Sequence, residues 1–259
     1  MYKHDVFDGN RMVNEDGLQL AAETSFFCHE TVQKVQCWST GWYDVQEDRD
    51  KSIEQFTIVY QDGCIRDVHW KNLDAIHLRQ RFCVSQDGKQ IFIPDYDKGL
   101  FAVDTETDVV CKRYNIKHIF ALWTTKKSLL CQHREYNAAI TRIDLQTQQK
   151  VEEVRINFTT RFIPVTKSCI MYCKGDKYAV FANADDLQIR HKIPIKALLG
   201  IDAEYFSIEG ASIDLTTSEM KVSYCKPRGG NSSGLVFGET TIKIPEETIC
   251  FIQEQEKHL

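Results

Sequence analysis

The sequence predicts an all-β protein built from repeated four-stranded units, and three observations support this prediction. Short runs of alternating apolar and polar residues recur along the chain, as expected for half-buried strands. Tight-turn segments such as Gln61-Asp62-Gly63 separate these runs. A run that ends at Asp104 returns about forty residues later at Asp144, which is the period of one four-stranded unit.

The first part of the chain contains strands without a regular repeat. Residues 10–23 form a strand-like piece with a turn at Glu15-Asp16-Gly17, and residues 31–38 alternate imperfectly. Residues 43–51, YDVQEDRDK, predict a charged loop. A clear hairpin follows over residues 53–70, where β-branched and aromatic residues lie on both sides of the turn.

The middle of the chain carries the clearest repeat. Residues 81–116 contain four strands in series, and residues 118–156 and 159–193 repeat this arrangement. The segments GLFAVDTETDVVCKRYNI and AAITRIDLQTQQKVEEVRI each lead from an alternating run through an Asp into a polar turn. Asp104 and Asp144 hold the same place beside a turn, where an Asp side chain bonds its own backbone. We therefore expect both to be structural and not a catalytic pair.

The C-terminal part is less regular. A degraded fourth unit spans residues 203–226, and residues 194–201 allow either a short helical turn or a loop. Residues 226–238, KPRGGNSSGLVFG, predict a longer surface loop because Gly and Ser dominate them. The stretch TTIKIPEETICFIQ predicts two further strands, which we expect to pair with N-terminal strands.

A β-propeller explains this repeat better than a sandwich does. A lone four-stranded blade has two largely apolar faces, and radial stacking of blades buries both faces. A sandwich or another all-β barrel is the alternative fold, but it does not naturally give a period of about forty residues over three units. We expect a single β-propeller domain over residues 1–259, with the clearest blades within 81–226. The length predicts about six small four-stranded blades, with five or seven as alternatives.

Composition restricts the partners and the compartment. The chain has 259 residues and a formal net charge of −5 with no long basic tract, so we expect no nucleic-acid partner. No apolar run approaches the length of a membrane span, and residues 1–17 lack the apolar core of a signal peptide. We therefore expect a cytoplasmic protein with no membrane partner. Most of the ten cysteines lie in apolar runs, where we expect reduced, buried thiols.

The repeat resembles the β-propeller superfamily in the wide sense, of the WD-repeat-like or quinoprotein-like type. The segments that carry this resemblance are AVDTETDVVCKRY, RIDLQTQQKVEEV and, more loosely, SIDLTTSEMKVSY from Ser212. In such propellers the third strand of a blade commonly ends in Asp, and a turn with Thr or Gly precedes the outer strand. The Gly-His and Trp-Asp signatures of true WD repeats are missing from the sequence, so the resemblance implies the fold and no particular family.

No motif predicts catalysis. The sequence has no GxSxG elbow, and the glycine-rich residues 229–234 lack the Gly-Lys-Ser/Thr ending of a phosphate-binding loop. We therefore expect no catalytic residue, no cofactor and no metal site; Cys28, His29 and Cys37 form only a weak metal-like cluster. The enzymatic alternative is a metal-dependent hydrolase of the six-bladed lactonase type, in which oxygen ligands from several strands surround a calcium ion. The residues near strand ends that could supply those ligands are Glu23, Asp95, Asp97, Glu135, Asn183 and Glu209.

The candidate binding residues lie where the repeat is broken. Trp and Tyr are enriched at the hot spots of protein interfaces, and charged residues follow an aromatic cluster in this chain. The predicted partner-binding residues are Trp38, Trp42, Tyr43, Glu47, Asp48, Arg49 and Arg228. Trp38 has an equally good second interpretation, which is packing between blades. The sequence therefore predicts a non-catalytic scaffold that binds a protein partner, of the adaptor or toxin-immunity type.

Overall fold

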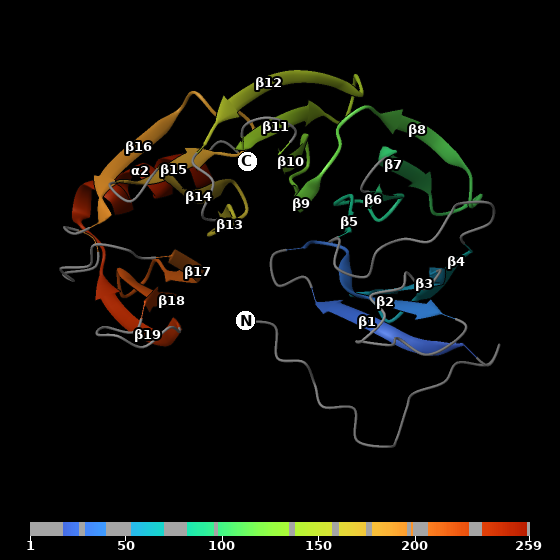
Figure 1. The fold of residues 1–259 in the computed structure, drawn as a ribbon, viewed down its shortest axis with the longest axis horizontal. Coiled ribbons are helices and arrows are strands. Elements are labelled where there is room, and N and C mark those ends of the chain that lie inside the picture. The colour runs from blue at the N-terminus through green and yellow to red at the C-terminus, as the bar shows by residue number, and fades with distance from the viewer. Residues whose placement is uncertain are drawn as a thin grey trace. The chain divides into compact units, whose positions relative to one another are not determined.

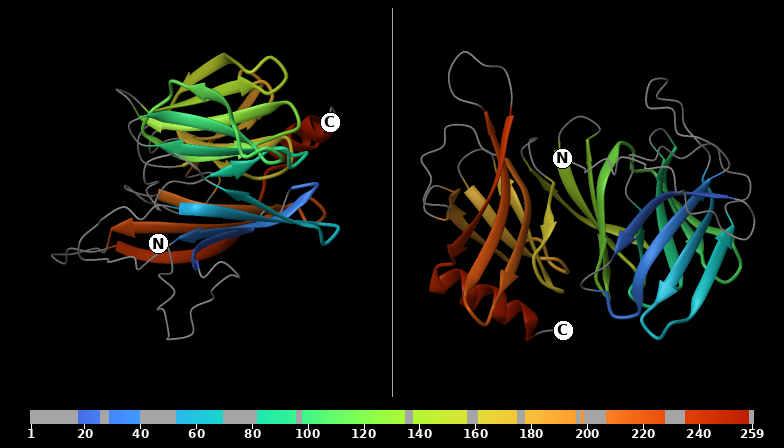
Figure 2. Two further views of the ribbon diagram at one scale, coloured as in Figure 1. Left: turned by 90° about the vertical axis from the view of Figure 1, so that its right-hand side faces the viewer. Right: turned by 90° about the horizontal axis from the view of Figure 1, so that it is seen from below.

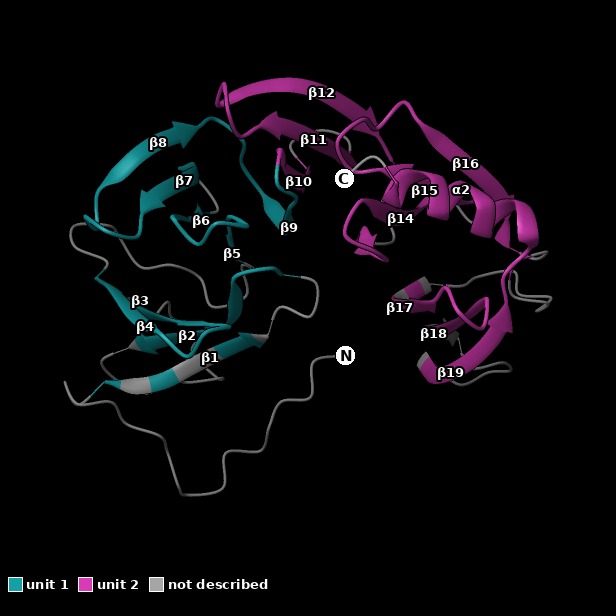
Figure 3. Ribbon diagram, turned by 180° about the vertical axis from the view of Figure 1, so that it is seen from behind, with its two compact units in different colours: residues 1–126 teal, residues 127–259 magenta. Residues whose placement is uncertain are grey.

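The structure is a computed structural model of the 259-residue chain. It describes residues 18–25, 29–39, 53–69, 82–95, 98–134, 138–156, 161–174, 178–195, 198, 207–227 and 235–257. The chain divides into two compact units, residues 1–126 and 127–259, which Figure 3 shows in teal and magenta.

The described strands form five antiparallel sheets, and the strands of each sheet follow one another in chain order (Figure 1). The first sheet contains β1 (Gln19–Ser25), β2 (Val32–Ser39), β3 (Ile53–Tyr60) and β4 (Ile65–His69). The second contains β5 (Cys83–Val84), β6 (Gln90–Asp95), β7 (Gly99–Asp104) and β8 (Val110–Tyr114). The third contains β9 (Ile119–Thr124), β10 (Ser128–Arg134), β11 (Ala138–Asp144) and β12 (Gln149–Arg155).

The fourth and fifth sheets lie in the second unit. The fourth contains β13 (Ile163–Pro164), β14 (Cys169–Lys174), β15 (Tyr178–Asn183) and β16 (Arg190–Pro194). The fifth has three strands, β17 (Ser207–Asp214), β18 (Glu219–Pro227) and β19 (Leu235–Lys243), and is followed by helix α2 (Glu246–Glu256). The predicted all-β propeller fold is confirmed. The expected six blades are wrong, because the described strands form five blades, four of them four-stranded.

The turns of the β7–β8, β11–β12 and β17–β18 hairpins are closed by an Asp side chain, as the sequence repeat predicted for Asp104 and Asp144. The Asp104 carboxylate accepts hydrogen bonds from the backbone N–H and the hydroxyl of Thr107, both at 2.9 Å. Asp144 accepts the same two bonds from Thr147, at 2.6 and 2.9 Å. Asp214, which ends β17, accepts bonds from the two backbone N–H groups that follow it at a spacing of two and three residues. These side chains bond their own turns, so their expected structural role is confirmed.

The residue that leads out of each of these turns has a left-handed backbone. Asp108, Gln148 and Ser218 have φ values of 61°, 54° and 58°. A type I turn followed by one left-handed residue is a common closure for hairpins with loops of this length. The repeat therefore extends from the Asp side chain to the backbone conformation four residues later.

The end of the chain differs from the prediction. Residues 241–243 of TIKI belong to β19, which pairs with β18. Residues 1–17, which could supply an N-terminal partner strand, lie outside the described residues. The residues ICFI, predicted as a strand, belong to α2. Glu246 and Glu247 lie in its first turn, where their charge suits the positive end of the helix dipole. Ile249 and Ile252 are three residues apart and both buried, which is a helical spacing.

Each unit has its own described core. In the first unit, side chains of the first and second sheets pack together, among them Phe56, Ile58 and Phe101. In the second unit one core joins the fourth sheet, the fifth sheet and α2, with Phe181 and Ile252 fully buried in it. Burial of side chains of this size stabilises the fold by about 1.5–3 kcal/mol each.

Helix α2 is anchored to the fourth sheet by hydrogen bonds, and Figure 2 shows it lying against the strands of its unit. The Glu256 carboxylate accepts bonds from the Thr166 hydroxyl at 2.5 Å, from the Ser168 backbone N–H at 3.1 Å and from the Ser168 hydroxyl. The preceding residue, Gln255, accepts a bond of 2.9 Å from the Asn183 side chain. The helix therefore holds both the turn that precedes β14 and the end of β15.

Candidate functional site

The predicted binding residue Trp38 lies inside the first sheet. It is 5% exposed, and its indole N–H donates a 2.8 Å hydrogen bond to the Thr57 hydroxyl on β3. That hydroxyl donates in turn to Asp67 on β4 at 2.5 Å. An indole nitrogen is a donor only, so the direction of this relay is fixed. Trp38 is therefore buried and bonded within its own sheet, and its predicted roles in packing between blades and in partner binding stay predictions.

The other predicted binding residues lie outside the described residues. These are Trp42, Tyr43, Glu47, Asp48, Arg49 and Arg228. Their role in binding a partner stays a prediction.

A second relay crosses the third sheet at the corresponding place. His133 on β10 lies 2.8 Å from the Thr141 hydroxyl on β11, and that hydroxyl donates to Glu153 on β12 at 3.2 Å. The single hydroxyl proton is used by Glu153, so His133 acts as the donor to Thr141. Lys150 bonds Glu153 at 2.5 Å, and this contact holds the pKa of Glu153 below its ordinary value.

The threonine hydroxyls at the centre of both relays are buried. Thr141 has no exposed surface, so its hydroxyl cannot reach a substrate. Thr57 and Thr141 each sit opposite their carboxylate partner in the strand register, Thr57 facing Asp67 and Thr141 facing Glu153. The recurrence at one register position indicates a blade-stabilising role, in which three neighbouring strands are joined by side chains.

The candidate metal ligands that the structure describes form hydrogen bonds or ion pairs with nearby residues. Glu23 binds the Lys34 ammonium at 3.0 Å and accepts a 2.7 Å bond from Gln36; these contacts hold its pKa below the ordinary value although burial alone would raise it. Asp95 accepts the Lys98 backbone N–H at 2.8 Å. Asn183 closes the turn after β15. The side chains of Asp97, Glu135 and Glu209 lie outside the described part.

In the weak cluster at Cys28, His29 and Cys37, the structure describes His29 and Cys37, and these two are not arranged as metal ligands. Both ring nitrogens of His29 are occupied, Nε2 by the Val84 carbonyl at 3.1 Å and Nδ1 by the Val32 backbone N–H at 3.0 Å. Burial lowers the pKa of His29 and raises that of the Cys37 thiol, which favours the neutral form of each. Throughout the described ranges, no three His, Cys, Asp or Glu side chains are placed to hold a metal ion.

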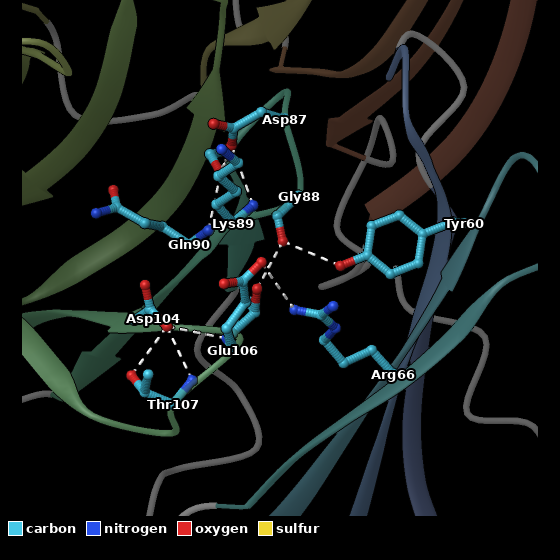
Figure 4. Close-up of polar contacts among 11 residues, drawn as sticks. Tyr60, Arg66, Asp87, Gly88, Lys89, Gln90, Asp104, Glu106 and Thr107 are labelled. Carbon is cyan, nitrogen blue, oxygen red and sulfur yellow. Dashed lines mark hydrogen bonds and ion pairs between the residues drawn. The ribbon is translucent and has the colours of Figure 1, made fainter.

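Further polar residues of the first unit join its first two sheets (Figure 4). Tyr60 donates to the Gly88 carbonyl at 3.1 Å, and Arg66 forms a 3.5 Å ion pair with Glu106. A Cβ at Gly88 would lie 2.5 Å from the Tyr60 ring, and Gly88 has a φ of 72°, so only glycine fits there. This cluster is a structural junction between sheets.

The fifth sheet provides the strongest candidate for a binding surface. Its alternating strands direct one set of side chains into the core and the other set outward. We call the outward side the open face; it comprises Ser212 of β17, Lys221 and Ser223 of β18, and Phe237, Glu239 and Thr241 of β19. The opposite side contributes Met220 and Val222 to the core.

The open face combines an ion pair with an exposed aromatic residue. Lys221 on β18 and Glu239 on β19 are diagonal neighbours that form an ion pair at 2.8 Å, and each side chain is 59% exposed. Ser223 donates to Glu239 at 3.3 Å. Phe237, two residues before Glu239 on the same face, is 47% exposed. An aromatic side chain framed by polar groups is typical of a protein-binding patch.

Sequence reasoning missed this face because it placed residues 226–238 in a loop. β19 begins at Leu235, so the last part of that segment is strand. The alternation of Phe237, Glu239 and Thr241 was the signal that could have shown it.

Comparison with known proteins identifies a fold-level similarity only. No protein-family model and no curated protein matches the sequence. Among solved structures, the chain is similar to BamB from Moraxella catarrhalis, with 9% identity, a TM-score of 0.44, and coverage of 82% of this chain and 74% of that one. It is also similar to the β-propeller domain of the Trilobed protease from Pyrococcus furiosus, with 13% identity, a TM-score of 0.48, and coverage of 89% and 71%.

No described helix has the length and the apolar character needed to cross a membrane. The five sheets, each following chain order, make this chain an all-β protein of the β-propeller type.

Proposed function

We propose that the protein is a non-catalytic scaffold and that it binds a protein partner through the open face of the fifth sheet. The observation that carries this proposal is the exposure of Phe237 beside the Lys221–Glu239 ion pair. Burial of a partially exposed aromatic side chain against a partner gains apolar contact area, and the surrounding charges favour one orientation of that partner.

The rest of the described site chemistry supports a scaffold more than an enzyme. The relay hydroxyl of Thr141 is buried, and Glu23, Asp95 and Asn183 are engaged by neighbouring groups. An adaptor or a toxin-immunity protein fits this picture, since both act by presenting a preformed surface. We also propose a cytoplasmic location, which the free thiols of the described cysteines support.

A position-specific photo-crosslinker tests the proposed face in cells of the source organism. The crosslinking residue replaces Phe237, and a matched control replaces Val151, which is 48% exposed on β12 of the third sheet. We expect one protein to be crosslinked from position 237 and not from position 151. The same measurement at position 42 tests the binding role predicted for Trp42.

A charge-exchanged variant shows whether the face itself recognises the partner. Lys221→Glu combined with Glu239→Lys keeps an ion pair across the two strands but reverses the position of each charge. We expect this variant to fold and to lose most of the crosslinking at position 237. Equal crosslinking from positions 237 and 151, or crosslinking unchanged by the charge exchange, would contradict the proposal.

A further inference from the structure

The free edges of the five sheets are not alike. An edge strand presents unpaired backbone N–H and C=O groups, and proteins commonly protect such edges with short strands, charged side chains, proline or bulges. The last strand of each of the first four sheets has such protection. The last strand of the fifth sheet, β19, has much less.

The four protected edges are short and charged. β4, β8 and β16 have five residues each, and β12 has seven. Each carries at least two charged residues, for example Lys112 and Arg113 on β8, and β16 ends in Pro194; β19 also carries two, Glu239 and Lys243, but spread over nine residues. The pairings of β7 with β8 and of β11 with β12 also contain a register shift.

β19 is longer and more regular. It has nine residues, and its register with β18 runs without a shift from Leu235 to Lys243. Its first four residues carry no charge. Gly238 does not break the strand, because the Tyr224 ring of β18 covers it so closely that a Cβ there would lie 2.8 Å from the ring. Within the described ranges, no strand pairs with the other edge of β19.

We propose that an extended segment of the protein partner adds to this edge as the fourth strand of the fifth sheet. Backbone hydrogen bonds would supply the pairing, and side chains on the open face would supply the selectivity. The segment would place a β-branched or aromatic residue beside Phe237, a basic residue beside Glu239 and an acidic residue beside Lys243. This inference rests on the proposed function, because it names how the partner of the same face is held.

The experiment uses a synthetic peptide of nine residues, the length of β19. When it lies antiparallel to β19, it has Glu, Thr, Lys and Val opposite Lys243, Thr241, Glu239 and Phe237, and Thr fills the other five positions. Amide exchange of the full-length protein is followed residue by residue by NMR. We expect the peptide to slow exchange at every second amide of β19 by about tenfold or more, because only alternate amides of an edge strand point outward.

Two control peptides separate strand addition from other binding. A peptide that is N-methylated at alternate residues cannot donate to β19, and we expect its affinity to fall at least about tenfold. A peptide with Glu and Lys exchanged keeps the backbone but reverses the charges, and we expect it to bind more weakly than the original. Equal binding by the N-methylated peptide, or no change in β19 exchange with the original peptide, would overturn strand addition.

Other occupants of the edge give different results. If the alternate amides of β19 are already protected in the free monomer, the chain itself covers the edge and the proposal is wrong. If that protection depends on protein concentration, a second copy covers it and the proposal is also wrong. Crosslinking from position 237 that persists when the peptide fails to bind would leave the proposed function standing and remove only the strand-addition inference.

Discussion

The fourth and fifth sheets share one core but bury different numbers of faces. The two middle strands of the fourth sheet, β14 and β15, are buried on both faces, as the fully buried pair Val180 and Phe181 shows. The fifth sheet buries Met220 and Val222 and exposes Lys221 between them. The same difference is visible in the sequence: β14 contains the continuous apolar run CIMYC, whereas β18 contains the alternating run EMKVS. The middle strands of one sheet are therefore covered on both faces, while the other sheet has one exposed face.

The largest effect we expect is the difference between two phenylalanines. Phe181→Ala removes a ring with no exposed surface, so it should lower the free energy of unfolding by about 3–5 kcal/mol. Phe237→Ala removes a half-exposed ring on the open face, and we expect less than about 1 kcal/mol. Urea unfolding followed by circular dichroism measures both values. Similar losses for the two variants would show that the open face is not open in solution.

The anchor of α2 on the fourth sheet should have the next largest effect. Glu256→Ala removes the acceptor of Thr166 and Ser168, and we expect the free energy of unfolding to fall by about 2 kcal/mol. The exposed Glu254 on the same helix provides the control, and Glu254→Ala should have little effect. Amide exchange near Ser168 should accelerate only in the first variant. Equal destabilisation by both changes would mean that helix propensity, and not the anchor, sets the effect.

The turns of the two sheets should differ in their response to acid. Asn183 closes the turn after β15 with an amide, whereas Asp214 closes the turn after β17 with a carboxylate. The Thr216 backbone N–H, with that of Thr217, holds the pKa of Asp214 below its ordinary value of about 3.9. A lowered pKa in the folded state stabilises above the unfolded pKa, and the stabilisation is lost as the pH falls through the folded pKa.

Thermal unfolding between pH 7 and pH 3 tests this difference. Asp214→Asn should lose part of the acid-dependent decrease in melting temperature. Asn183→Ala should lower the melting temperature at every pH, because the bond to Gln255 is lost as well as the turn bonds. The expected loss in the free energy of unfolding is roughly 1–2 kcal/mol. An unchanged pH profile for Asp214→Asn would indicate that other carboxylates account for the acid sensitivity.

The smallest effect concerns the ion pair on the open face. The Lys221 ammonium lowers the pKa of Glu239 through a hydrogen bond and through its charge. Lys221→Ala should therefore raise the pKa of Glu239 towards its ordinary value, while the melting temperature stays nearly constant, because exposed pairs contribute little to stability. A side-chain NMR titration of Glu239 measures the shift. A large fall in melting temperature would mean that the pair is a structural element of the fifth sheet.

The local features of the fold could be predicted because they depend on neighbouring residues. Asp104 and Asp144 bond within their own turns, and their placement followed from the sequence alone. The end of the chain could not be predicted in the same way. Ile249 and Ile252 are compatible with a short apolar strand, and the core of the second unit provides the contacts that a helix can use. The loop expected over residues 226–238 was wrong at residues 226–227 and 235–238 for the same reason, since these strand ends are defined by the pairing of β18 with β19.

The candidate site was only partly predictable for a related reason. Aromatic residues near a break in the repeat suggested binding, but Trp38 is buried and its indole is bonded to Thr57. The positions of aromatic residues can be taken from the sequence, but which face of a sheet remains exposed cannot. Phe237 stands out only after the exposure of its strand is known.

The all-β class, the repeat of about forty residues and the self-bonded turns could all be predicted from the amino-acid sequence, because strand alternation and Asp-capped turns act over a few residues. The tertiary structure decided the number of blades, the helical end of the chain, the internal role of Trp38 and the exposure of one face of the fifth sheet. Each of these depends on which distant segments pack together. Packing between distant segments has no fixed pattern in the sequence of a single strand.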